Sequence, residues 1–203
     1  MKIVQILIKL VLLAAAVVLV YFIYAGIQKP IDFEKHRKER FAKTIERLVD
    51  IRTAQIAYKN QYGYFTPSFD TLVFYVKTGK LPIVKAIGSV PDSLTEKEAL
   101  KLGIIQRDTF YLNIVDTLFK HINYPIEELG YLPVGKKIKF RMDTATVMTG
   151  SNVSVKVFEA RANNWDILDG LDRQYIINYN SEKDSVLKVG SLEVANNNAG
   201  NWE

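Results

Sequence analysis

The 203-residue chain contains no cysteine. This absence excludes disulfides, thiol nucleophiles, thiolate zinc sites and iron–sulfur clusters, but it does not fix the compartment. Histidine is also scarce, because His36 and His121 are the only two. Neither has a second histidine three or four residues away, so a histidine-based zinc protease motif is absent. The chain also lacks a G-x-S-x-G nucleophile elbow, and we interpret both histidines as surface residues.

Two segments resemble ligand-binding motifs without completing them. Residues 130–137 approach a P-loop, but lysine replaces the final Ser/Thr, and the alternation that follows predicts a strand where a P-loop needs a helix. Asp166, Asp169 and Asp172 could offer oxygens to Ca²⁺, but they lack the spacing and the glycine of a calcium loop. We therefore predict no catalytic, cofactor-binding or metal-binding residue, no small-molecule substrate and no enzyme activity.

Charge of one sign is concentrated in a short part of the chain. The formal net charge is +5, yet residues 53–203 hold 17 basic and 17 acidic side chains. Residues 29–52 hold eight basic and five acidic ones, next to an apolar segment. This distribution is typical of a membrane flank and not of a nucleic-acid surface, which needs clustered positive charge on a folded face.

The apolar segment is the strongest signal in the sequence. Residues 10–27 contain no charged side chain, and with residues 3–9, where Lys9 can extend its amine to the interface, they are long enough to cross a bilayer. Tyr21, Phe22 and Tyr24 lie near the far end, where aromatic rings favour the interface. The run is longer than a signal-peptide core and no small-x-small site stands out. We predict one uncleaved membrane span over residues 1–28, with the lipid bilayer as a partner.

The orientation of this span has two readings. Basic residues cluster after the span, and the positive-inside rule counted literally puts the C-terminal part in the cytoplasm. The arrangement of a short N-terminus, one span and a long C-terminal part is that of an exported signal-anchored protein. We expect the C-terminal domain on the outer side of the inner membrane, and the cytoplasmic orientation remains the alternative.

A second helical pattern follows over residues 29–62. Pro30 either opens this helix or lies within a continuous one. An apolar stripe at near-helical spacing contains Phe41, Ile45, Leu48, Val49 and Ile56. The stripe either packs on its own domain or contacts other subunits, so Phe41, Ile45 and Leu48 are candidate partner-binding residues.

The remaining chain predicts a mixed fold. Gly63 ends the long helix, Thr66 and Pro67 open a short helix, and Ser93–Glu96 reads as a capping box for another. Period-two alternation from about residue 108 predicts strands, including 138–143 and 153–157, with a closing strand at 186–194 and a helix capped by Asp172. Residues 149–152, which contain Gly150, are expected to turn a strand that ends near Met148 into one that ends near Ala160. The fold class is therefore α+β, with helices first and a small antiparallel sheet afterwards.

This pattern divides the chain into five parts: a transmembrane anchor (1–28), a juxtamembrane amphipathic helix (29–62), a short-helix region (63–103), an antiparallel β-rich domain (104–195) and a polar tail (196–203). We expect the tail to be flexible. Trp202 is its one large side chain. It either folds back onto the domain or binds another subunit, which makes it a fourth candidate partner-binding residue.

Two resemblances add to this reading. The N-terminal helix, its amphipathic extension and the Tyr-rich turn at residues 58–65 resemble type II secretion pseudopilins and type IV pilins, although residues 1–8 contain neither the glycine nor the glutamate of those proteins. The whole chain resembles an uncharacterised family of single-span envelope proteins from Bacteroidota. The segments that carry this second resemblance are 51–64, 107–109, 158–160, 170–172, 187–192 and the terminus NNNAGNWE.

The resemblances imply a bacterial inner-membrane protein with a periplasmic C-terminal domain. From them and from the missing chemistry we expect a non-enzymatic subunit of a trans-envelope assembly, related to secretion or transport, that binds other envelope proteins or further copies of itself. A pilin-like filament subunit is the first alternative, and a metal-dependent periplasmic module is the second.

Overall fold

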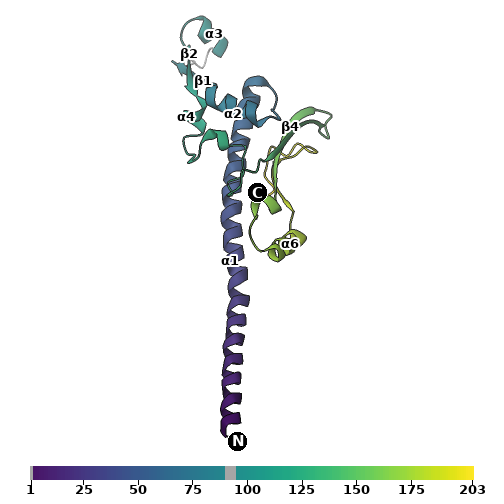
Figure 1. Ribbon diagram of the computed structural model, residues 1–203. Coiled ribbons are helices and arrows are strands. Elements are labelled where there is room, and N and C mark those ends of the chain that lie inside the picture. The colour runs from purple at the N-terminus through teal and green to yellow at the C-terminus, as the bar shows by residue number, and fades with distance from the viewer. Residues whose placement is uncertain (1, 90–94) are drawn as a thin grey trace.

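Helix α1 (Lys2–Tyr62) forms an unbroken rod, and the rest of the chain gathers around its C-terminal half (Figure 1). The computed structural model describes residues 2–89 and 95–203. Pro30 lies inside α1 and does not end it, so the two helical patterns of the sequence are one element. The predicted α+β class is confirmed.

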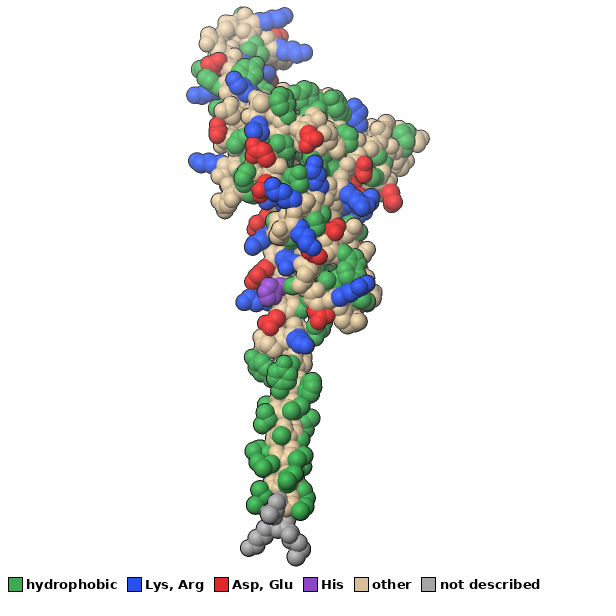
Figure 2. All heavy atoms as spheres, viewed as in Figure 1, with side chains coloured by type: hydrophobic (Ala, Val, Ile, Leu, Met, Phe, Trp, Pro, Cys, Tyr) green, Lys and Arg blue, Asp and Glu red, His purple; other side chains and the backbone are tan. Residues whose placement is uncertain are grey.

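The rod has a bare part and a covered part. The large apolar side chains from Val4 to Ile27 are 50–66% exposed, and Figure 2 shows them as an apolar column below the charged head. From Val4 onward, the first buried side chain is that of Phe33, whose ring lies 5.3 Å from that of Tyr175. The bare part is long and apolar enough to cross a membrane, and it is compatible with a single-pass anchor.

The head consists of short elements on several sides of α1 (Figure 1). The helices are α2 (Phe69–Thr78), α3 (Glu96–Lys101), α4 (Ile114–Leu118), the 3₁₀ turn η1 (Ile126–Glu128), α5 (Asn164–Ile167) and α6 (Arg173–Glu182). The strands are β1 (Lys80–Ile87), β2 (Gln106–Asn113), β3 (Arg141–Met148), β4 (Ser154–Asn163) and β5 (Val186–Gly190). They form a β1-β2 ladder and a β3-β4-β5 sheet, both antiparallel.

The buried face of α1 is wider than the predicted stripe, because the head covers the helix from more than one side. Four of its buried residues are polar or charged: Thr44, Arg47, Asp50 and Gln55. The apolar ones recur at helical spacing and are Phe33, Leu48, Ile51, Ala54, Ala57 and Tyr58. Ile56 was expected to lie on the packed face but is 39% exposed. The hydrophobic pattern underestimated the width of this face, because several of the side chains buried on it are polar.

The turn after α1 is fixed by an amide. Gly63 takes a left-handed φ of 79° and donates its backbone N–H to the Lys59 carbonyl, which confirms the predicted helix end. Buried Gln55 donates to the Thr66 carbonyl at 2.6 Å and accepts from the Thr66 N–H at 3.1 Å. Thr66 is thus engaged with α1, and the N-cap of α2 is Ser68, not Thr66 as predicted.

Several predicted boundaries move. The strand whose alternation was expected from residue 138 begins at Arg141, and it ends at Met148 as predicted. The next strand continues past Ala160 to Asn163, and the closing strand ends at Gly190, four residues early. Strand β1 was not predicted, and the β1-β2 ladder crosses the boundary placed between residues 103 and 104. Thr95 caps α3, with its N–H and hydroxyl both donating to Glu98, so the box lies two residues later than expected. Ser93 lies outside the described residues.

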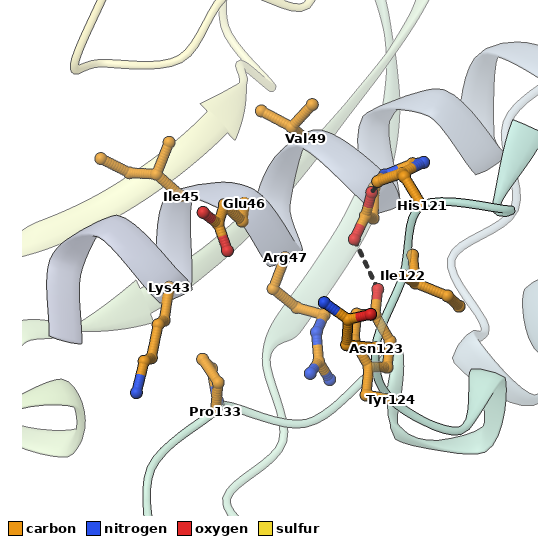
Figure 3. A pocket seen from close by; sticks show the side chains of 11 residues that line it. Lys43, Ile45, Glu46, Arg47, Val49, His121, Ile122, Asn123, Tyr124 and Pro133 are labelled. Carbon is orange, nitrogen blue, oxygen red and sulfur yellow. Dashed lines mark hydrogen bonds and ion pairs between the residues drawn. The ribbon is translucent and has the colours of Figure 1, made fainter. Parts of the chain in front are cut away.

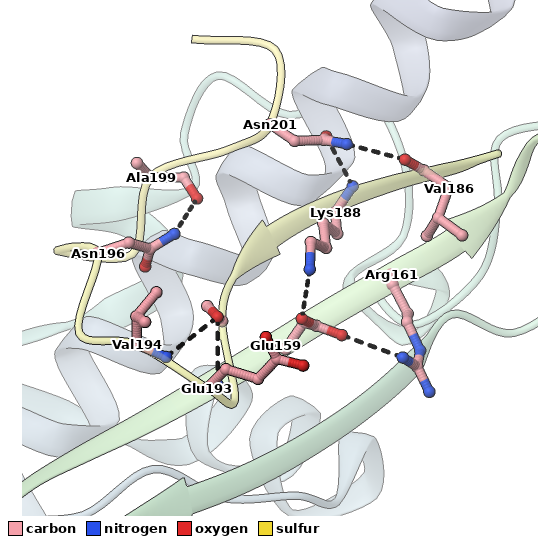
Figure 4. Close-up of polar contacts among 10 residues, drawn as sticks. Glu159, Arg161, Val186, Lys188, Glu193, Val194, Asn196, Ala199 and Asn201 are labelled. Carbon is pink, nitrogen blue, oxygen red and sulfur yellow. Dashed lines mark hydrogen bonds and ion pairs between the residues drawn. The ribbon is translucent and has the colours of Figure 1, made fainter. Parts of the chain in front are cut away.

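The polar tail is ordered, contrary to the expectation of flexibility. It runs beside β5, where the Gly190 N–H donates to the Ala199 carbonyl and the Asn201 N–H to the Lys188 carbonyl. The Asn201 side chain adds two more bonds to β5, which Figure 4 shows. Arg52 of α1 donates to the Asn198 carbonyl and pairs with Glu203 at 2.6 Å. The C-terminus is therefore attached to both the sheet and the rod.

Candidate functional site

The β1-β2 ladder projects from the head as an arm, in the direction of α1 and away from its N-terminus (Figure 1). Helix α3 lies at its far end. Every residue of β2 is exposed. A two-stranded ladder has little stability of its own in water unless one face packs on something, which makes the arm the first place to look for a binding surface.

The two faces of the arm differ. Cross-strand partners share a face, and alternate residues share it along a strand. One face carries the pairs Leu81–Leu112, Ile83–Phe110, Lys85–Asp108 and Ile87–Gln106. Its large apolar side chains are exposed by the following fractions: Ile83 42%, Ile87 51%, Phe110 48% and Leu112 45%. We call this face the apolar arm face.

Helix α3 belongs to the opposite face. Arg107, which alternates with the residues of the apolar arm face, forms an ion pair with Glu96 of α3. Ala99 of α3 and Ile105, directly before β2, are buried. The small core at the end of the arm therefore forms on one side and leaves the apolar arm face exposed on the other.

One opposite-charge pair lies in the middle of the apolar arm face. Lys85 and Asp108 are cross-strand partners between the Ile83–Phe110 and Ile87–Gln106 pairs. Among the residues that the structure describes, neither forms an ion pair. Charges of both signs are thus available within an apolar surface.

The base of the arm rests on tyrosines. Tyr58, Tyr62, Tyr64 and Tyr75 have ring centroids 4.6–6.5 Å apart, and the Tyr75 hydroxyl donates to the Ala57 carbonyl at 3.0 Å. The hydrogen bond with Tyr64, together with burial, raises the pKa of Tyr58 to about 12. Burial raises the pKa of Tyr75 as well. This cluster joins the end of α1 to α2, from which β1 continues.

A second candidate is a polar cluster against the middle of α1, beside a cavity of about 690 Å³. Buried Asp50 accepts from the Tyr124 hydroxyl at 2.6 Å and lies 3.0 Å from His121 Nε2. The Arg47 guanidinium lies 3.4 Å from the Tyr124 ring centroid and donates to the carbonyls of Glu128 and Tyr131. Figure 3 shows Arg47 beside Tyr124 between the helix and the loop, with His121 farther along the helix.

The electrostatics of this cluster indicate a structural role, in which its side chains hold a loop against α1. Burial and the bond to Asp50 raise the pKa of Tyr124, and burial lowers the pKa of Arg47. Both Asp50 oxygens already have partners, and Arg47 is occupied by carbonyls. In the described part of the chain, no group of three or more His, Asp or Glu is placed to hold a metal ion. The arrangement fastens residues 119–131 to α1.

A third polar group is likewise internally paired. Glu159 on β4 is 6% exposed and receives Arg161 at 3.2 Å and Lys188 at 3.0 Å (Figure 4). Two of the three acidic residues weighed as calcium ligands also have other partners. Asp169 pairs with Lys136 at 2.6 Å, and Asp172 caps α6 by accepting from the Gln174 N–H. Helix capping was the predicted role of Asp172 and is confirmed.

The four candidate partner-binding residues all contact the head. Leu48 is fully buried. Phe41 and Ile45 are partly buried against the same core, with the Phe41 ring 5.6 Å from that of Tyr179. Trp202 is also partly buried, and its indole lies over Gly200. Sequence reasoning missed the apolar arm face, whose signal was the alternation at 106–113 without a recognised partner strand.

Comparison with known proteins yields no relative: no family model, no curated protein sequence and no solved structure matches this chain.

Proposed function

We propose that this protein is a single-pass membrane protein that presents an interaction head in the bacterial periplasm, as a non-enzymatic subunit of a trans-envelope assembly. The observation that carries the proposal is the division of α1. One continuous helix has an apolar column without contacts to the head, followed directly by a segment buried within it.

The division has an energetic reason. The large apolar side chains from Val4 to Ile27 are exposed, and each would cost on the order of 1 kcal/mol or more in water relative to an apolar environment. A bilayer removes that cost and satisfies the length requirement. Because the helix continues without a linker, the head is held rigidly relative to the membrane.

The head supports a binding role. Its polar clusters at Asp50 and Glu159 are closed by internal partners, whereas the apolar arm face is open. Exposed contiguous apolar surface is typical of protein contact sites. The pilin-like alternative draws on the same bare helix, because such a column could also pack inside a filament.

Protease accessibility tests the location. With a C-terminal tag, the chain should fractionate with membranes and resist alkaline extraction, and protease added to spheroplasts should digest the tag while a cytoplasmic marker survives. Removal of residues 1–28 should release the head into the soluble fraction. Protection of the tag until detergent is added would contradict the periplasmic orientation, and filaments sheared from intact cells would favour the pilin-like alternative.

A further inference from the structure

We propose that the apolar arm face binds the same face of a second copy of this chain anchored in the same membrane. This inference rests on the proposed function, because the shared membrane sets the relation between the copies. It names the partner for the exposed apolar side chains of this face, which are Ile83, Ile87, Phe110 and Leu112.

The membrane restricts the symmetry of such a pair. Two copies inserted in the same direction are related by a two-fold axis along the membrane normal. Figure 1 shows the arm extending from the head on the side away from the N-terminus of α1, and in the proposed pair this axis runs along β1 and β2. A half-turn about it brings the two apolar arm faces together and places β1 of one copy over β2 of the other at equal height.

Cross-strand partners within one arm then become partners between copies. Ile83 faces Phe110 of the second copy, and it does so twice, because this pair shares a height on the ladder and the axis exchanges the copies. Exposed Leu112 extends the contact at the base of the arm, where its cross-strand partner Leu81 packs on the core of its own chain. Two such sheets pack about 10 Å apart through their side chains. The apolar pairs are therefore self-complementary under the only axis that the membrane allows.

Charge supports the same arrangement. The rotation places Lys85 over Asp108 of the second copy, and it does so twice, because the axis exchanges the copies. Both side chains lack an ion-pair partner among the described residues of their own chain. Within an apolar contact, unpaired charge would be costly, and the two-fold arrangement gives each charge an opposite one.

The size of the face explains why a membrane-held copy is the fitting occupant. Strands of this length at about 3.4 Å per residue make a face about 27 Å long and about 10 Å wide, on the order of 300 Å² per copy. Stable complexes formed from solution bury about 800 Å² per partner. The arm is small for a partner captured from solution, but confinement at the same height raises the effective concentration.

The chain lacks cysteine, so introduced thiols report contacts directly. Two differently tagged full-length copies are expressed together, one carrying Ile83→Cys and the other Phe110→Cys, and membranes are treated with a short thiol crosslinker. We expect a product containing both tags. The matched control uses Val84→Cys with Thr109→Cys, which are cross-strand partners on the opposite face, and should give none.

Charge reversal separates a contact between copies from an effect within one arm. Lys85→Glu in both copies should reduce the crosslink several-fold, and Asp108→Lys in both should do the same. A mixture of one Lys85→Glu copy with one Asp108→Lys copy should restore it, because opposite charges again face each other between copies. Within each arm of that mixture the like charges remain, so damage to the arm itself would not be rescued.

The outcomes distinguish the two proposals. If the chain is in the membrane, three results would overturn the two-copy contact alone. They are the absence of a crosslink, equal crosslinking on both faces, and a crosslink from Ile83→Cys to a different protein. Chain found in the soluble fraction would overturn the membrane anchor, and the two-copy contact with it.

Discussion

At the residue scale, the asparagine-rich composition that predicts disorder in the C-terminal tail also favours tight turns. Asn197 and Asn198 take left-handed φ values of 55° and 59°, a conformation that asparagine tolerates better than most residues. The asparagine-rich tail therefore turns back and pairs with β5. Composition alone suggested that the tail is flexible. It does not distinguish polar residues that face water from polar residues that adopt a left-handed backbone and form hydrogen bonds to the edge of a strand.

The buried polar residues of the candidate sites were similarly hidden from the sequence. His121 was correctly placed near the surface, with its side chain 66% exposed. Its partner Asp50 looked like one more charge on a mixed-sign helix, yet it is buried beneath Tyr124. The two residues are 71 positions apart, and local patterns carry no information about such a contact.

Substitution of Tyr124 is predicted to change both the stability of the head and the dependence of that stability on pH. Tyr124→Phe leaves an Asp50 oxygen buried without its donor, so we expect the free energy of unfolding of a head fragment, residues 29–203, to fall by about 1–3 kcal/mol at neutral pH. Burial raises the pKa of Tyr124 in the folded state. The folded state thus holds its proton above the ordinary tyrosine pKa near 10, where the unfolded chain releases it, and stability is lost as pH rises beyond that value.

Urea midpoints at pH 8 and pH 11 measure both effects. The decline between them should be smaller in Tyr124→Phe than in the parent, and it should not vanish, because the pKa values of Tyr58 and Tyr75 are raised too. Tyr111→Phe is the control, since Tyr111 is 65% exposed. An unchanged neutral-pH midpoint in Tyr124→Phe would show that the cluster around Asp50 does not stabilise the head.

At the element scale, the sequence predicted element types better than their limits. The long helix, the β3-β4 hairpin and the helix capped by Asp172 follow from periodicity and caps and are confirmed. Strand β1 was missed, because its residues 80–87 contain a proline and two lysines within a short apolar run. Proline is tolerated there because β1 is an edge strand. The local sequence does not favour a strand by itself, so the strand forms because it pairs with β2.

The lower limit of the head gives an element-scale prediction. From Val4 onward, Phe33 is the first buried residue of α1, and it packs against Tyr175 of α6. A fragment that begins at Lys29 should fold cooperatively, and one that begins at Arg37 should be less stable by about 3–5 kcal/mol, as for removal of a buried phenylalanine. Phe33→Ala in the longer fragment separates loss of this ring from loss of the helical turn. Equal urea midpoints for all three would place the start of the head after Phe33.

At the scale of the whole molecule, a rigid rod converts sequence position into height. From Gln28, at the end of the apolar column, to Tyr62, at the end of α1, a helix rises about 50 Å at about 1.5 Å per residue. Figure 1 places α6 at the lower end of the head and the arm at the upper end. If α1 is anchored as proposed, α6 lies near the lipid surface, and the arm begins about 50 Å from it. Whatever contacts the arm must reach that height.

Fluorescence quenching in vesicles can measure this height. The full chain, reconstituted with a single dye at Ile177→Cys on α6 or at Thr109→Cys on β2, is compared in vesicles with and without headgroup-labelled quencher lipids. Both positions follow from exposed side chains. We expect strong quenching at position 177 and almost none at 109, because contact-range quenching does not extend across tens of ångströms. A dye in the bare helix, at Val17→Cys, confirms insertion.

Strong quenching at position 109, together with an inserted helix, would contradict this height. It would mean that the rod bends or tilts until the arm lies on the membrane. The pairing of two arms at equal height would then lose its geometric basis.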